Sequence, residues 1–464
     1  MDDIEWHNFL HGDNKSCLGR LWLDEMGTSG ELTELRVRCD GGCNQIRWLS
    51  EAAGPNNPAL GKCNGQQKWL GPEFEQQDCD KTMRLLIRTA SNAYFPLKVS
   101  VISMPDRDEL FRTAIDACWE SVLKNITNRD ELVFALRMMT EIKAKLEMYS
   151  IDEIWSEIEA RRSKQATGGN ANTPDNIRTP ELKLLTSPAK YLGEDGLDSP
   201  FYAEAVDISE SEKKPYMDLI ERVVMIHRLR EVTALVGYSR FDYISQDNDD
   251  DLPSDAEMAA LGKNTDWLPA VENRGEGIFI QLNKQQVEHW ASLPEVQAAT
   301  QSFNEGVAIY NDEHQSNRKF RGPEFVLLHT LSHLLMNSIS LECGYPSASI
   351  KERIYNDKEV GYGIMLYTAS SDSHGTLGGL ALAAKSIDVY LKKALELGTK
   401  CSNDPICSLH RPEDPNDKRH FQGAACHSCV FISETSCECL NDFLDRNLVV
   451  RTISGSEQHY FTID

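Results

Sequence analysis

Cysteine is the residue type in this sequence whose spacing most clearly indicates chemistry. Nine of the thirteen cysteines lie in two groups near opposite ends of the chain. Four thiolates arranged tetrahedrally bind zinc tightly, and a two-residue spacer lets one turn present two sulfurs to the same ion. The sequence therefore predicts two structural zinc sites, one in the N-terminal group, Cys39, Cys43, Cys63 and Cys79, and one in the C-terminal group, Cys401, Cys407, Cys426, Cys429 and Cys437.

The C-terminal group offers five cysteines for the four positions around one ion. Its Cys-x-x-Cys pair and Cys437 supply three ligands, and the fourth is either Cys407 or Cys401. We expect Cys407, because the Asp-Pro-Ile segment at 404–406 is typical of a turn that presents the next side chain. Four protein ligands leave no open position for water, so the predicted role of the ion is structural.

The N-terminal group is more widely spaced. Cys39 and Cys43 are separated by three residues, whereas Cys63 and Cys79 have no cysteine partner close by in the sequence. A zinc ion here is still the favoured interpretation. Alternative ligands for it are Cys17, His7 and His11.

The N-terminal end of the chain is acidic and has no apolar core, so it is not a signal peptide. We therefore expect a cytoplasmic protein. In a reducing cytosol, paired cysteines indicate a metal more often than a disulfide. The longest apolar stretch, 325–336, is too short to cross a bilayer, so no membrane span is predicted.

Composition and charge indicate a globular protein that does not bind nucleic acid strongly by itself. Hydrophobic residues make up 41% and charged residues 26% of the 464 residues, which is ordinary for a chain of two to four domains. The formal net charge is −24. A phosphate backbone repels such a surface unless basic residues are gathered into a patch.

Two further motifs have both a functional and a structural interpretation. His329 and His333 are four residues apart, a spacing that can present two imidazoles to one metal, but the glutamate of the metalloprotease motif is missing. Burial with side-chain hydrogen bonds is the favoured interpretation. The Ser- and Gly-rich segment 370–379 either binds phosphate or caps a helix, and it lacks the Walker lysine.

The periodicity of apolar residues predicts an α+β, multidomain chain. Strands are expected at 32–38, 201–206, 232–238 and 363–368, and a turn enters a strand at 275–280. Helices are expected within 106–163, at 324–341 and at 377–397. The predicted domains are an N-terminal zinc-ribbon-like, zinc-binding module at 1–104, a helical segment at 105–166, a linker at 167–180, a mixed α/β region at 181–305, and a C-terminal α/β domain at 306–464 closed by a four-cysteine zinc site.

Several segments resemble the DrmB family of the bacterial DISARM antiphage systems. The most specific are His-Thr-Leu-Ser-His-Leu-Leu at 329–335 and Gly-Ala-Ala-Cys-His-Ser-Cys at 423–429. The Cys-x2-Cys-x7-Cys ending is also similar to the C-terminal zinc domain of certain superfamily 2 DNA helicases. Further similar segments lie at 88–96, 228–232, 275–279, 343–349 and 366–370.

The resemblance implies a non-motor, zinc-binding accessory subunit that pairs with a superfamily 2 helicase and engages DNA as part of that complex in antiviral defence. The helicase would hydrolyse ATP. Family members usually carry a further N-terminal segment before the stretch that begins here near Ile4, which implies a short variant, a split gene product or a member of a related defence system. The metal ligands that the resemblance implies are Cys39, Cys43, Cys63 and Cys79 for one zinc ion, and Cys407, Cys426, Cys429 and Cys437 for the other.

Two alternatives to an accessory subunit remain. One is a metal-dependent phosphodiester hydrolase. The sequence argues against it, because it has no clear set of carboxylates that would bind the catalytic metal. The other is a structural scaffold that does not contact nucleic acid. If the chain does contact DNA, the basic segment 318–321 is a candidate for that contact. The hydrolase would use His329, His333, His374 and Asp372.

Overall fold

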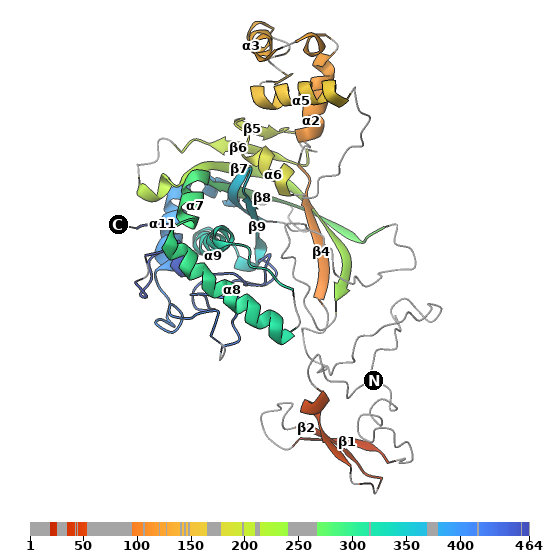
Figure 1. Cartoon of the computed structure of the whole chain (residues 1–464), viewed down its shortest axis with the longest axis vertical. Coiled ribbons are helices and arrows are strands. Elements are labelled where there is room, and N and C mark those ends of the chain that lie inside the picture. Colours follow the sequence, from red (N-terminus) through yellow and green to blue (C-terminus); the bar gives the residue numbers. More distant parts are fainter. Residues whose placement is uncertain are drawn as a thin grey trace. The chain divides into compact units, whose positions relative to one another are not determined.

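The computed structural model divides the chain into two compact units, which we describe separately (Figure 1). Unit 1 comprises Met1–Lys98, Leu235–Ile244 and Asp255–Pro269, and unit 2 comprises Val99–Ala234, Ser245–Ser254 and Ala270–Asp464. The structure describes residues 19–25, 35–41, 43, 45–52, 95–104, 107–119, 121–126, 128–139, 142, 145–146, 149–164, 178–196, 199–208, 214–239, 267–314, 317–368, 379–414, 417–455 and 457–463.

Unit 1 contains a three-stranded antiparallel sheet in the order β1-β2-β3. The strands are β1 (Leu21–Glu25), β2 (Leu35–Cys39) and β3 (Ile46–Trp48), and the 3-10 turn η1 (Leu49–Ala52) follows. In β2, Val37 and Cys39 are buried while the residues between them are partly exposed, as expected for a strand with one covered face. This confirms the strand predicted at 32–38 for the residues from 35 onward.

A seven-stranded sheet forms the centre of unit 2, in the order β5-β6-β7-β8-β10-β9 with β4 on β7. Strands β5 to β10 pair antiparallel throughout. The C-terminal part of this sheet is therefore not the α/β arrangement that we predicted. Strands β9 and β10 form an antiparallel hairpin with no helix between them. The strands are β4 (Phe95–Ile102), β5 (Tyr191–Gly193), β6 (Tyr202–Val206), β7 (Ile220–Ser239), β8 (Ala270–Leu282), β9 (Ile350–Asp357) and β10 (Gly361–Thr368).

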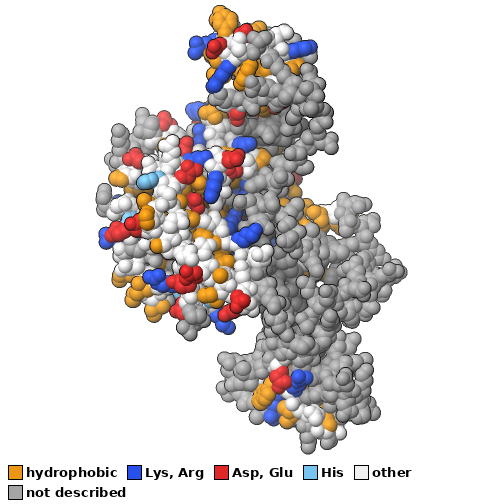
Figure 2. All heavy atoms as spheres, in the orientation of Figure 1, with side chains coloured by type: hydrophobic (Ala, Val, Ile, Leu, Met, Phe, Trp, Pro, Cys, Tyr) orange, Lys and Arg blue, Asp and Glu red, His pale blue; other side chains and the backbone are white. Residues whose placement is uncertain are grey.

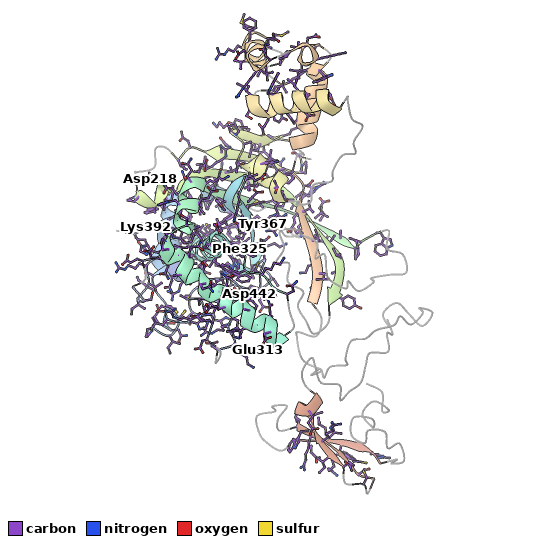
Figure 3. The ribbon with its side chains drawn as sticks, in the orientation of Figure 1. Asp218, Glu313, Phe325, Tyr367, Lys392 and Asp442 are labelled. Atoms are coloured by element: carbon purple, nitrogen blue, oxygen red, sulfur yellow. The ribbon has the colours of Figure 1, made fainter. Side chains whose placement is uncertain are left out.

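Helix α9 (Pro323–Cys343) lies at the centre of the largest core. It contacts the sheet through β9 and β10, and Figure 1 shows it end on, surrounded by other helices. Its residues 325–336 are all buried, which is typical of a helix enclosed in a core, and Figure 3 labels its fully buried Phe325. The helices that contact it are α7 (Lys284–Ala291), α8 (Pro294–His314), α10 (Gly379–Ala383), α11 (Ile387–Gly398) and α12 (Arg446–Val449).

Two smaller cores complete unit 2. Helix α6 (Arg178–Leu185) packs its leucines against the other face of the sheet, next to Phe279 and Met365. Helices α2 (Arg107–Trp119), α3 (Arg129–Met138) and α5 (Ile151–Lys164) bury a separate apolar cluster, which confirms the helical segment predicted within 106–163. The 3-10 turns in unit 2 are η5 (Leu123–Asn125), η6 (Pro215–Met217), η7 (Ser347–Ser349) and η8 (Ala384–Ser386).

Most predicted elements are confirmed, and two differ from the prediction. The helix predicted at 377–397 is divided into α10 and α11 by the turn η8. Strand β8 begins at Ala270, so Gly275 lies within a strand and not in a turn. Glycine is needed there because a Cβ atom would fall 1.5 Å from the Thr368 carbonyl oxygen.

The mixed helix and sheet character is confirmed, while the predicted domain limits stay a prediction. One sheet contains strands from both sides of the predicted boundary between residues 305 and 306. Residues 167–177 of the predicted linker at 167–180 and residues 370–378 lie outside the described residues, and 178–180 belong to α6. Among the helices that are described, none combines the length and apolarity needed to span a membrane.

Candidate metal centre

Four cysteines of unit 2 converge in a cluster that we call the four-cysteine centre: Cys401, Cys407, Cys426 and Cys429. Their ligand atoms all lie within 4.8 Å of one another. The Sγ–Sγ distances are 3.5 Å from Cys401 to Cys426, 3.8 Å from Cys407 to Cys429 and 3.7 Å from Cys426 to Cys429. A tetrahedral zinc ion with Zn–S bonds of about 2.3 Å requires sulfurs about 3.8 Å apart. The cluster therefore fits zinc.

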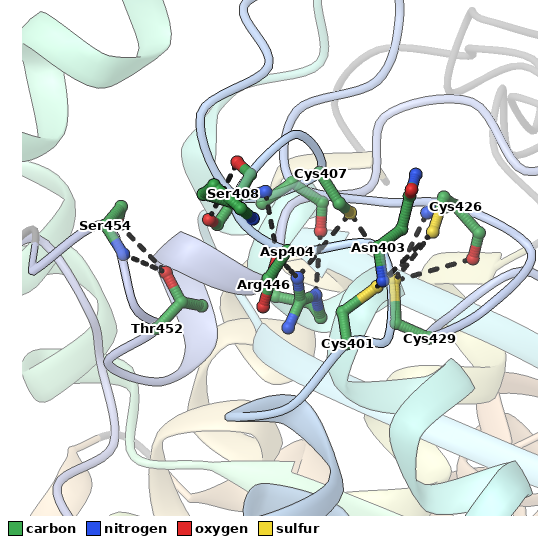
Figure 4. A network of polar contacts seen from close by, with 12 residues as sticks. Cys401, Asn403, Asp404, Cys407, Ser408, Cys426, Cys429, Arg446, Thr452 and Ser454 are labelled. Carbon is green, nitrogen blue, oxygen red and sulfur yellow. Dashed lines mark hydrogen bonds and ion pairs between the residues drawn. The ribbon is translucent and has the colours of Figure 1, made fainter.

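Two tight turns present these sulfurs (Figure 4). The first follows α11, where the amide of Cys407 donates to the carbonyl of Asn403 at 3.1 Å, and this confirms the turn predicted at 404–406. The second is the Cys-x-x-Cys turn, closed by a 3.1 Å bond from the amide of Cys429 to the carbonyl of Cys426. Backbone amides also donate to the sulfurs of Cys401 and Cys426, at 3.3 and 3.4 Å. Such donors stabilise thiolates.

Arg446 contacts the four-cysteine centre at Cys407. Its guanidinium is fully buried and lies 3.5 Å from the Sγ of Cys407 and 3.0 Å from the carboxylate of Asp404 (Figure 4). It also donates to the backbone carbonyls of Ala424 and Gly398, at 3.1 and 2.9 Å. Four thiolates around one zinc ion carry a net charge of −2, which a neighbouring guanidinium partly offsets. Sequence reasoning missed Arg446, because it lies outside the cysteine pattern.

The thiols of Cys401 and Cys407 are protonated at neutral pH when no metal is bound. Burial raises the pKa of Cys401 to about 11. The hydrogen bond with Cys429, together with burial, raises the pKa of Cys407 above its usual range. An ion must therefore displace protons when it binds, which is the usual behaviour of structural zinc sites.

Asp445 positions Arg446 by capping α12. Its carboxylate accepts hydrogen bonds from the amides of Asn447 at 2.8 Å and Ala424 at 3.1 Å. Burial nevertheless raises its pKa to about 6. The folded protein therefore binds this proton more tightly than the unfolded chain, in which an aspartate titrates near its ordinary value of about 3.9.

We expect the Asp445→Asn variant to gain stability relative to the wild type as the pH rises. The contribution of Asp445 is fully present below about pH 4 and is lost as pH rises through about 6, because the folded state must then hold a buried charge. Asparagine can accept the same two hydrogen bonds without ionising, so the variant should gain about 2 kcal/mol between pH 4.5 and 8. Urea unfolding of both proteins at the two pH values measures this gain. Equal differences at both pH values would contradict it.

The structure separates Cys437 from the other three predicted C-terminal ligands. It places Cys437 with His329, His333 and Glu352, and brings Cys401 into the four-cysteine centre together with Cys407. Both Cys401 and Cys407, the two alternatives for the fourth ligand, lie in the four-cysteine centre, while the ligand set itself stays a prediction. Cys437 is separate because the turn after it directs its sulfur toward α9, where it lies 3.1 Å from the Nε2 of His329.

The N-terminal zinc site stays a prediction. Cys39 is buried at the end of β2, and its Sγ accepts a hydrogen bond from the amide of Gly41 at 3.3 Å. Cys43 is partly exposed. The other predicted ligands and their alternatives lie outside the described residues: Cys63, Cys79, Cys17, His7 and His11.

The predicted burial of the two histidines in α9 is confirmed. His333 Nδ1 lies 2.8 Å from the carbonyl of Val430, and both rings contact Glu352. The remaining residues of the predicted hydrolase site, His374 and Asp372, lie outside the described residues.

Comparison with known proteins agrees with a zinc-binding part at the C-terminal end. The family model "MrfA Zn-binding domain" matches residues 331–430, a span that contains all four residues of the four-cysteine centre and ends before Cys437. A model described as "Domain of unknown function (DUF8724)" matches residues 1–95. The chain therefore contains a zinc-binding domain whose cysteine cluster is compatible with zinc.

A solved structure described as "Crystal Structure of DUF1998 helicase MrfA bound to DNA" aligns with 55% of this chain and 29% of its own length. The identity is 11% and the TM-score is 0.22, which is too low to indicate a shared fold. A much stronger relative is the "DISARM protein DrmB" of Bacillus paralicheniformis (strain ATCC 9945a / NCIMB 11709 / CD-2). It is 31% identical over 473 residues, covering 99% of this chain and 80% of that protein. With this identity along nearly its whole length, the chain belongs to the DrmB family of DISARM proteins.

Proposed function

We propose that this protein is a non-motor accessory subunit that pairs with a superfamily 2 helicase and helps the complex engage DNA in antiphage defence. The observation that carries the proposal is family membership, because the chain aligns with a DISARM protein over 99% of its length. The helicase partner is supported by the match to a zinc-binding domain named after MrfA, a protein described as a helicase bound to DNA. The cytoplasmic location predicted from the sequence stays a prediction.

The chemistry of the four-cysteine centre supports a structural role. All four positions around a zinc ion would be filled by cysteine, so no position is left for a water or a substrate. The metal-dependent hydrolase is less well supported, because His329 and His333 face Glu352 and Cys437 inside a core and not an open cleft. We assign ATP hydrolysis to the helicase, as the family resemblance implies.

The surface charges support DNA engagement through the complex and not by this chain alone. Figure 2 shows basic side chains interspersed with acidic ones over the described residues of the face in view. The basic segment 318–321 does not form a free basic patch. Arg318 pairs with Asp442 at 2.8 Å, and the guanidinium of Arg321 lies 3.8 Å from the ring centre of Phe325. With a net charge of −24, the chain by itself should be repelled by DNA.

Co-purification tests the proposal. We expect a tagged copy of this chain, expressed with the neighbouring genes of its native operon, to retain a helicase in about equal amount. The complex should bind DNA with an affinity that falls steeply with salt, while the chain alone binds weakly. A chain that purifies without a helicase and cleaves labelled DNA in the presence of divalent metal would favour the hydrolase instead. If crosslinking within the complex labels only the helicase, the chain is a scaffold without DNA contact.

A further inference from the structure

Four polar side chains lie together inside the largest apolar core, apart from the four-cysteine centre. His329 and His333 come from α9, Glu352 from β9 and Cys437 from the C-terminal turn region. The two histidines are fully buried, and Glu352 and Cys437 are 1% and 8% exposed. Burying polar groups in a core costs free energy unless each is bonded to a partner. Their grouping therefore requires an explanation.

The four side chains direct one ligand atom each toward a common point. The Nε2 atom of His329 lies 3.0 Å from the Oε1 of Glu352 and 3.1 Å from the Sγ of Cys437. The Nε2 of His333 lies 3.3 Å from the same Oε1 atom. A tetrahedral zinc ion with bonds of about 2.0–2.1 Å to nitrogen and oxygen and about 2.3 Å to sulfur places its ligands roughly 3.3–3.6 Å apart. The observed distances are a few tenths of an ångström shorter than those of a filled site, so the ligand atoms would move slightly apart when an ion binds.

The contacts around these side chains are those of metal ligands. His333 is held through its Nδ1, 2.8 Å from the carbonyl of Val430, so that atom carries the hydrogen and Nε2 keeps a lone pair. The Sγ of Cys437 accepts hydrogen bonds from the amides of Cys439 and Asn441, at 3.3 and 3.2 Å. These donors match the amide-to-sulfur bonds in the four-cysteine centre.

The surroundings of Glu352 and His329 leave one atom of each facing the cluster. The Ser332 hydroxyl donates to the second oxygen of Glu352, which leaves Oε1 facing the histidines. The Nδ1 atom of His329 has no hydrogen-bond partner among the described residues. All polar contacts of that ring therefore lie on the side of Nε2, where the other three ligand atoms converge.

The charge of the cluster favours a divalent cation. Among the described contacts, the carboxylate of Glu352 is approached by two imidazoles, a hydroxyl and the amide of Glu438, and by no lysine or arginine. A buried carboxylate without a cation is strongly unfavourable. One zinc ion with one carboxylate, one thiolate and two neutral imidazoles has zero net charge.

We infer that His329, His333, Glu352 and Cys437 form a second metal site, which holds a zinc-like divalent transition-metal ion between α9, β9 and the C-terminal turn region. Two nitrogens, one oxygen and one sulfur are all ligands that zinc accepts in structural sites. The site is closed and buried, so its ion connects three elements that are distant in the sequence. It does not depend on a helicase partner, and a failed co-purification would leave it unaffected.

Metal content of the full chain tests this inference. We expect Cys437→Ala and Glu352→Gln each to contain one zinc ion fewer than the wild type, measured by elemental analysis of protein purified without chelators. Cys343→Ala is the matched control, since Cys343 belongs to neither cluster, and it should lose none. Because the zinc content of each variant is compared with that of the wild type, any zinc bound by the N-terminal cysteines contributes equally to both and does not affect the difference. A Cys437→Ala protein that keeps all of its metal would overturn the inference.

A measurement on the wild type covers the case in which the variants do not fold. Crystals of the unaltered full chain should show anomalous scattering that changes across the zinc absorption edge, with a peak among these four side chains. A second peak among the cysteines of the four-cysteine centre serves as the internal reference. A peak at the four-cysteine centre with none beside His333 would mean that the histidines and Glu352 form a hydrogen-bonded cluster without an ion, and the inference would be wrong.

Discussion

The Cys426→Ser variant should lose the zinc ion of the four-cysteine centre and much of the stability of the C-terminal part of unit 2. The two turns that carry the four cysteines contain few regular elements, so the ion supplies cross-links that backbone hydrogen bonding does not. Zinc binding contributes about 10–16 kcal/mol in isolated zinc-finger peptides, and losing one ligand removes part of that. We expect a loss of more than about 3 kcal/mol, measured by zinc content and urea unfolding, with proteolysis locating the unfolded part.

The controls for this prediction are two other cysteines. Cys401→Ser should behave like Cys426→Ser, because the structure places Cys401 among the four ligands. Cys343→Ser should keep its zinc and its stability within about 1 kcal/mol, since Cys343 is only partly buried and outside the cluster. A Cys401→Ser protein with its full zinc content would show that the ion is held by a different set of residues.

Local pattern was enough to predict α9, which lies beside both clusters, but it did not predict β9 or α12. Helix α9 is rich in large apolar residues on every side, and such a sequence is typical of a helix buried in a core. Its ends are also visible in the sequence, because Pro323 begins it and Gly344 ends it with a positive φ of 72°. The strands β6 and β10 are similarly short, apolar and bounded by turn residues.

The composition of each metal cluster could not be predicted in the same way. Spacing predicts that Cys426 and Cys429 share an ion, but it contains no information on the direction in which Cys437 points. That direction depends on the packing of the C-terminal turns against α9 and β9, which are far away in the sequence. Arg446 was missed for the same reason, since a single arginine has no periodic or spacing signal.

The Arg353→Met variant is expected to destabilise the protein by about 3–5 kcal/mol. The guanidinium of Arg353 is 1% exposed and forms a two-point ion pair with Glu181, at 2.7 and 3.0 Å. Glu181 also accepts hydrogen bonds from the hydroxyl of Tyr355 at 2.9 Å and the amide of Ile102 at 3.2 Å. Removing the cation leaves the buried carboxylate of Glu181 without a charged partner. Urea unfolding of the variant and the wild type measures the cost.

A double substitution separates the effect of the unpaired charge from that of lost packing. Glu181→Gln combined with Arg353→Met removes both charges and keeps one oxygen, which can accept from either the Tyr355 hydroxyl or the Ile102 amide, so it should cost less than either single change. Arg451→Met is the matched control, because its ion pair with Glu457 is exposed and should contribute less than about 1 kcal/mol. If Arg353→Met is no more harmful than Arg451→Met, the buried pair does not stabilise the junction of α6, β9 and β4. If instead the double variant costs as much as the sum of the singles, the loss arises from packing and not from charge.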